Sequence, residues 1–124
     1  MSMNLDPKRL WLEALRSGGY QQGVDALASI MRGHRDEYCC LGVACEVAVM
    51  SGVELEKRVS NKDFGVYTYD GMTDSLPYSV ASWLGVDVAD PTVSTPTGVS
   101  RRLSQLNDDG RTFAELANLI EAQL

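Results

Sequence analysis

The stretch from Tyr38 to Met50 constrains the fold of this chain more than any other. It is the longest run of small and apolar residues, it holds all three cysteines, and Glu46 is its only charge. A segment of this composition is either the central buried element or the wall of a site. The apolar spacing predicts a helix up to about Met50 that presents one apolar face, made of Leu41, Ala44, Cys45 and Ala48.

Length and charge narrow the class of protein. With 124 residues and 44% hydrophobic residues, the chain is most simply one globular domain over residues 1–124. The formal net charge is -6, yet residues 1–35 carry five basic and three acidic side chains. A protein that binds duplex DNA needs a basic face, so the overall sign disfavours that function.

Neither a membrane protein nor a secreted disulfide scaffold is indicated. No stretch reaches the roughly 18 uncharged apolar residues of a membrane span, and the N-terminus lacks the apolar core of a signal peptide. Three cysteines, two of them adjacent, do not form a typical disulfide framework. We therefore expect a cytoplasmic protein with reduced thiols.

The N-terminal third contains one clear helix and one ambiguous segment. Residues 1–5 are predicted to be a flexible tail, after which Asp6 as N-cap and Pro7 as first helical residue begin a helix. Gly18-Gly19 ends this helix. In residues 20–35, helical apolar spacing is bracketed by glycines, so both a helix and an irregular strand remain open.

The rest of the chain mixes strands and helices. Alternation over residues 53–74 predicts a small antiparallel hairpin or ribbon, with Asp70-Gly71 as a turn. A short helix is expected after Leu76-Pro77, followed by an irregular loop over residues 86–98 that is a candidate edge of a site. Two helices end the chain, the second with a capping box between Thr112 and Glu115. The predicted fold class is α+β, a helix-dominated single domain.

Several fragments, taken in order, resemble one family. They are Trp11-x-x-Ala14-Leu15-x-Ser17-Gly18-x-Tyr20-x-Gln22-Gly23, Tyr38-Cys39-Cys40-Leu41-Gly42-Val43-x-Cys45, Leu76-Pro77, Trp83-Leu84-Gly85 and Leu106-Asn107-Asp108-x-Gly110-x-x-Phe113-Ala114. This order is similar to that of an uncharacterised group of small proteins encoded mainly by bacteriophages and prophages, notably of actinobacteria. The resemblance implies a phage accessory protein that acts in the cytoplasm of an infected bacterium. It implies no catalytic residue.

The cysteines allow several interpretations. With His34 they offer three sulfurs and one imidazole, nominally a structural zinc set, but adjacent cysteines do not easily reach one ion and a Cys-x2-Cys pair is absent. A thiol-dependent enzyme would pair Cys39 or Cys40 with His34 as base. Buried reduced thiols are the favoured reading, with a vicinal disulfide or redox role also open. We predict no metal and no cofactor.

The last helices contain the one signal for DNA recognition. The apolar spacing from Leu103 to Ala117 resembles the first two elements of some helix-turn-helix domains. Glu121 lies where a basic residue would favour a phosphate backbone. A DNA-associated regulator remains an alternative function because of this spacing. Duplex DNA is nevertheless not the partner that we expect, because the acidic side chain disfavours it.

One polar cluster is left over after core, caps and turns are assigned. A Tyr-Gln-Gln run lies between glycines, and basic and aromatic side chains follow it in sequence. Aromatic, amide and guanidinium groups can stack, form paired hydrogen bonds and neutralise a phosphate or carboxylate. We predict that a host protein or a small anionic ligand binds, without catalysis, at Tyr20, Gln21, Gln22, Arg32, His34, Arg35 and Tyr38, with loop 86–98 as a candidate lid.

Overall fold

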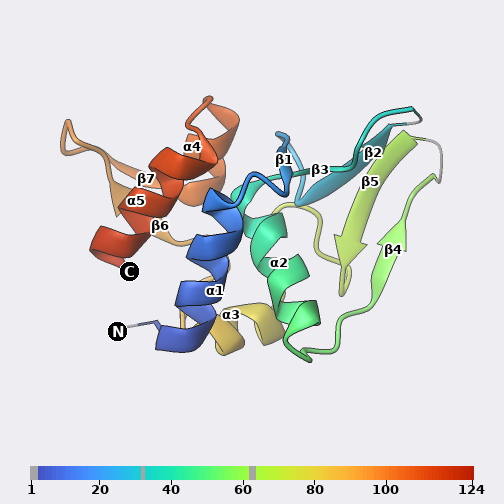
Figure 1. Ribbon diagram of the computed structural model, residues 1–124, viewed down its shortest axis with the longest axis horizontal. Helices are drawn as coiled ribbons and strands as arrows, with labels where there is room; N and C mark the ends of the chain where they lie inside the picture. The colour runs from blue at the N-terminus through green and yellow to red at the C-terminus, as the bar shows by residue number, and fades with distance from the viewer. Residues whose placement is uncertain (1–2, 32, 62–63) are drawn as a thin grey trace.

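The computed structural model describes residues 3–31, 33–61 and 64–124 and has an α+β fold (Figure 1). The helices in these residues are α1 (Leu5–Arg16), α2 (Cys40–Met50), α3 (Tyr78–Leu84), α4 (Leu103–Asp108) and α5 (Phe113–Gln123). The strands are β1 (Gln21–Gln22), β2 (Ala28–Met31), β3 (Glu37–Tyr38), β4 (Lys57–Val59), β5 (Phe64–Tyr69), β6 (Thr92–Ser94) and β7 (Ser100–Arg102). The predicted fold class is confirmed.

Helix α2 is the centre of the molecule. Figure 1 shows it between α1 on one side and the larger sheet on the other. Eight of its eleven residues are buried, so it is apolar around most of its circumference rather than along the single predicted face. A Cβ at Gly42 would lie 1.8 Å from the carbonyl oxygen of Leu27. The helix therefore crosses the Leu27 backbone at a distance that only glycine permits.

The larger sheet has the order β1-β3-β2-β5-β4 and is antiparallel except for the β1–β3 pair. Residues 28–31 form β2, which decides the open question about the segment 20–35 in favour of a strand. The hairpin expected in residues 53–74 is the β4–β5 pair, in which Lys57 lies opposite Tyr69. Asp70 and Gly71 follow with φ of 52° and 82°, the left-handed turn expected of this dipeptide.

The N-terminal residues differ from the prediction of a flexible tail. Met3 is 4% exposed and joins the core, and the amide of Asn4 donates to the Leu84 carbonyl over 2.8 Å. Asn4 is the N-cap and α1 begins at Leu5, one residue before the predicted cap at Asp6. The tertiary bond to the end of α3 orders this segment, and no local sequence signal contains that information.

The segment 86–98, predicted as an irregular loop, contains strand β6 paired with β7 in a second, two-stranded sheet. The short helix after Leu76-Pro77 is α3, which ends at Gly85 in the left-handed conformation with φ of 81°. At the start of α5, Thr112 and Glu115 form the predicted capping box.

A buried polar junction joins four separate parts of the chain. The Asn107 side chain, in α4, is 1% exposed. Its oxygen accepts hydrogen bonds from the Cys40 amide over 3.1 Å and from the Gln22 side chain over 2.9 Å. Its amide group donates to the Gly23 carbonyl over 2.8 Å. The Cys40 carbonyl in turn accepts from the indole of Trp11 over 2.9 Å. These bonds hold the start of α2 against α1, α4 and β1.

Candidate functional site

Part of the predicted polar cluster comes together at one pocket of about 270 Å³. It is formed by the turn after α1, strand β1, and the turn before β3. The rings of Tyr20 and Tyr38 meet edge to face, with 5.3 Å between centroids and 88° between planes. The residues that line this tyrosine pocket are Gly19, Tyr20, Gln21, Arg35, Asp36 and Tyr38.

Arg35 is positioned by the backbone and not by an acid. One of its terminal nitrogens donates to the Gly19 carbonyl over 2.9 Å. Among the described residues it forms no salt bridge, although Asp36 is its neighbour in the pocket. The Asp36 carboxylate accepts from the Tyr67 hydroxyl over 3.0 Å. The guanidinium thus retains donors for a ligand.

A partly buried charge pair lies behind the tyrosines. Glu46 of α2 accepts from the Tyr69 hydroxyl over 2.6 Å and from Lys57 over 2.9 Å. The Lys57 nitrogen also lies over the Tyr67 ring, 4.5 Å from its centroid. The charge of Glu46, the one charge in the central apolar stretch, is therefore offset by Lys57.

The tyrosines of this region remain protonated, neutral hydroxyls near neutral pH. Burial, followed by the charges of Glu46 and Asp36, raises the pKa of Tyr38. Burial and Glu46 also raise the pKa of Tyr20. The Tyr20 hydroxyl contacts the sulfur of Met50 over 3.9 Å. The two rings offer neutral hydroxyls and aromatic edges to a ligand.

The remaining predicted site residues are placed differently. The Gln22 side chain turns inward: it donates to Asn107 and to the Arg111 carbonyl over 2.7 Å, and accepts from the Phe113 amide over 3.1 Å. Its polar atoms are thus used to hold the C-terminal helices. His34 is exposed in the turn between β2 and β3, outside the lining of the tyrosine pocket. Arg32 lies outside the described residues.

The three thiols are free and buried, with at most 2% of each cysteine exposed. Cys39 is the N-cap residue of α2, and burial raises the pKa of its thiol to about 11. Burial likewise raises the pKa of Cys40 and Cys45. The Cys40 thiol contacts the Leu103 carbonyl over 3.8 Å. These surroundings suppress the thiolate, the form that acts as nucleophile and metal ligand.

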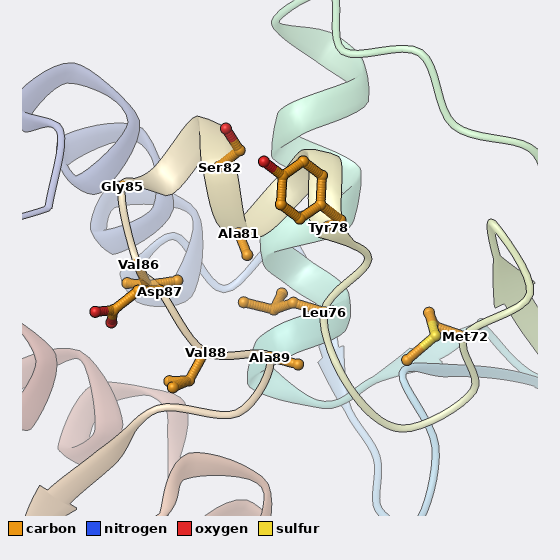
Figure 2. A pocket seen from close by; sticks show the side chains of 10 residues that line it. All are labelled: Met72, Leu76, Tyr78, Ala81, Ser82, Gly85, Val86, Asp87, Val88 and Ala89. Carbon is orange, nitrogen blue, oxygen red and sulfur yellow. The ribbon is translucent and has the colours of Figure 1, made fainter.

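Sequence reasoning missed a larger, apolar pocket of about 630 Å³ beside α3 (Figure 2). The Ala81 side chain points from α3 toward the space that the Leu76 side chain also enters, while the Asp87 carboxylate points away from them. Residues 86–89 form one wall of this pocket, and the expectation that the segment 86–98 edges a functional site stays a prediction. It is a different site, however, because this α3 pocket shares no lining residue with the tyrosine pocket.

A third cavity of about 540 Å³ is polar and contains the carboxylates of Asp25, Asp74, Asp90 and Asp108. No group of three or more histidine, cysteine or acidic side chains is arranged to hold a metal ion in residues 3–31, 33–61 and 64–124. His34 and the cysteines therefore do not form the nominal zinc set within that part of the chain.

The apolar spacing that resembled a helix-turn-helix belongs to the core. Leu103, Leu106, Phe113 and Leu116 are between 0% and 8% exposed. On the outer side of α5, the Glu121 carboxylate pairs with Arg16 over 3.2 Å. The C-terminal helices thus use their apolar residues to cover α1 and α2.

The fold and pockets define a small α+β protein with buried thiols and open cavities at its surface. The chain belongs to the family described as Domain of unknown function (DUF8296), whose model matches residues 3–124. No match to the chain was found among curated proteins or among solved structures. None of the described helices combines the length and apolar composition that crossing a membrane requires.

Proposed function

We propose that this protein is a non-catalytic binding protein and that the tyrosine pocket is its principal site. The observation that carries the proposal is the convergence of Tyr20, Tyr38, Gln21 and Arg35 on one open pocket. Aromatic rings and an arginine are the side chains most enriched at the energetic centres of binding interfaces. Here both rings are held by their mutual edge-to-face contact, so little ordering is required on binding.

The proposed partner is a host protein or a small anionic ligand. Arg35 supplies a guanidinium that forms no salt bridge among the described residues. The hydroxyls of Tyr20 and Tyr38 are neutral donors at neutral pH, and their raised pKa values extend that protonated range to higher pH. The charge of Glu46 is offset by Lys57, whereas Asp36 accepts a hydrogen bond from the neutral Tyr67 hydroxyl and keeps its negative charge. An acidic side chain, a phosphate or a carboxylate fits this set of donors.

The setting that we propose is the cytoplasm of an infected bacterium, where the protein acts as a phage accessory protein against a host factor or a signalling ligand. Its motif order supports this proposal. The alternative of a thiol-dependent enzyme is weaker, because burial raises the pKa of Cys39 to about 11 and keeps the thiol from ionising.

The test compares affinity capture from a bacterial lysate by the wild-type protein and by the double variant Gln21→Ala/Arg35→Ala, with mass spectrometry of proteins and small molecules. Both side chains are exposed, so the variant should keep the melting temperature of the wild type. The captured species should fall at least tenfold. The variant Arg101→Ala, which removes an exposed arginine elsewhere, should capture as the wild type does.

Undiminished capture by the double variant would place the site elsewhere. Chemical turnover of a captured small molecule during incubation would replace the binding function with an enzymatic one. Capture of duplex DNA would favour the regulator.

A further inference from the structure

All charged side chains in the segment 64–100 are negative. It contains four aspartates, Asp70, Asp74, Asp87 and Asp90, and neither lysine, arginine nor histidine. This segment supplies every residue that lines the α3 pocket. It also supplies Asp74 and Asp90 to the third cavity, which is called the acidic cavity below. Any partner that enters here therefore meets negative charge on its approach.

The α3 pocket is built to receive an apolar group. Its floor is Leu76, 2% exposed, and Ala81, 7% exposed. Around it, Tyr78 and Val88 leave 88% and 52% of their surfaces exposed, and Figure 2 shows them with the other lining residues. Large exposed apolar side chains beside an apolar hollow are typical of interaction sites.

The acidic cavity adjoins this pocket, because Ala89 lines both. Asp90 is held by the hydroxyl and the amide of Ser104, and Asp108 accepts from the Asp25 amide over 3.1 Å. Within the described part of the chain, none of the four carboxylates of this cavity forms a salt bridge. Arg102 is the one basic residue in the lining, so the cavity keeps an excess of negative charge.

We propose that the α3 pocket and the acidic cavity together bind a segment of a partner protein in which a large apolar side chain lies close to lysine or arginine. The apolar side chain enters the α3 pocket, and the basic side chain reaches the carboxylates beyond Ala89. Charge complementarity selects this occupant over an acidic or uncharged apolar segment. The proposal does not rest on the tyrosine pocket, with which this surface shares no lining residue.

The first experiment selects short peptides from a random displayed library on the immobilised full-length protein. Enrichment of sequences that place a leucine, phenylalanine or tryptophan within a few residues of lysine or arginine is expected. Enrichment of purely apolar or acidic sequences, or none at all, would overturn the proposal. Binding of a simple cationic amphiphile without any enriched peptide would also overturn it, in favour of a small-molecule site.

The second experiment measures fluorescence polarisation with an enriched peptide and with two altered peptides. Replacing its lysine or arginine residues with glutamate, or its large apolar residue with serine, should each weaken binding tenfold or more. The affinity of the unaltered peptide should fall as salt is added, since the carboxylates are reached from solvent. Equal binding of the charge-reversed peptide would contradict the role of the aspartates.

Variants of the protein locate the surface. Tyr78→Ala and the pair Asp25→Asn/Asp74→Asn should each weaken peptide binding at least fivefold. The matched controls Phe64→Ala, another exposed aromatic, and Glu54→Gln, another exposed acid, should change it less than twofold. Asp25 has φ of 69°, a conformation that asparagine also adopts, so its replacement preserves the fold. Full binding by both site variants, or concentration-dependent self-association that competes with the peptide, would reject the assignment.

Discussion

Two polar clusters in this protein place hydrogen-bonding side chains in opposite settings, one buried in the fold and one open to solvent. At the buried junction, the amide side chains of Asn107 and Gln22 form hydrogen bonds with distant parts of the protein. At the tyrosine pocket, Arg35 makes one bond to the Gly19 carbonyl and keeps its other donors free of salt bridges within the described residues. The buried junction is therefore closed to a ligand, whereas the tyrosine pocket is open to one.

This difference distinguishes polar side chains that stabilise the fold from polar side chains that are available to a partner. A buried polar group whose bonds are all satisfied specifies one packing arrangement, and its removal leaves partners unsatisfied. An exposed group with spare donors contributes little to stability and is available to a partner. Adjacent residues of one strand illustrate this, because Gln22 belongs to the junction and Gln21 to the pocket.

The largest effect is expected at the close contact beneath the junction. Gly42→Ala places a methyl group 1.8 Å from the Leu27 carbonyl oxygen, and a backbone atom cannot move aside as a flexible side chain would. We expect a loss of roughly 3 kcal/mol or more in the free energy of unfolding, enough to unfold a marginal domain. Urea denaturation followed by circular dichroism measures it. Gly19→Ala, where the nearest atom is the Ser17 hydroxyl at 3.3 Å, is the control and should be tolerated.

Asn107→Ala should come next. It leaves the Cys40 amide and the Gln22 side-chain amide without their buried acceptor, so we expect a loss of about 2–4 kcal/mol. The control Asn118→Ala removes an exposed asparagine that accepts from Arg16, and should cost less than about 1 kcal/mol. Equal stability of the two variants would show that the junction contributes nothing to the fold.

The pair Gln22→Ala and Gln21→Ala compares the two clusters within one strand. Loss of the Gln22 side chain breaks bonds to Asn107, Arg111 and Phe113, and should cost about 1–3 kcal/mol. Loss of the exposed Gln21 side chain should change stability by less than about 0.5 kcal/mol. Thermal denaturation of both variants distinguishes them, and a reversed order would contradict the division into closed and open clusters.

Alkaline pH should reveal the buried thiol at the start of α2. Burial raises the pKa of Cys39 from 9.0 to about 11, so between these values the unfolded chain loses a proton that the folded chain keeps. The contribution of Cys39 to stability should therefore be complete below pH 9 and should fall by about 2 kcal/mol as the pH rises to 11. Cys39→Ala should show a shallower decline in denaturation curves measured across this range. An unchanged slope in the variant would mean that other groups, such as the tyrosines, account for the whole effect.

The sequence predicted the fold class, the central helix, the β4–β5 strands, α3 and the capping box of α5. These features depend on local signals: apolar periodicity, turn dipeptides and capping residues. The prediction of a flexible tail was wrong for residues 3–5, because Asn4 is ordered by a bond to the distant Leu84 carbonyl. Of the proposed site, Tyr20, Gln21, Arg35 and Tyr38 do line one pocket. Their binding role stays a prediction.

The sequence by itself determined where the chain is apolar, where it turns and which short segments become helices or strands. Each of these features depends on neighbours a few residues away. The tertiary structure alone decided that Gln22 faces inward while Gln21 faces outward, and that Asp25, Asp74, Asp90 and Asp108 surround one cavity. It also decided that Gly42 meets Leu27. These facts depend on which distant segments come into contact, and such contacts follow from the packing of the whole core around α2.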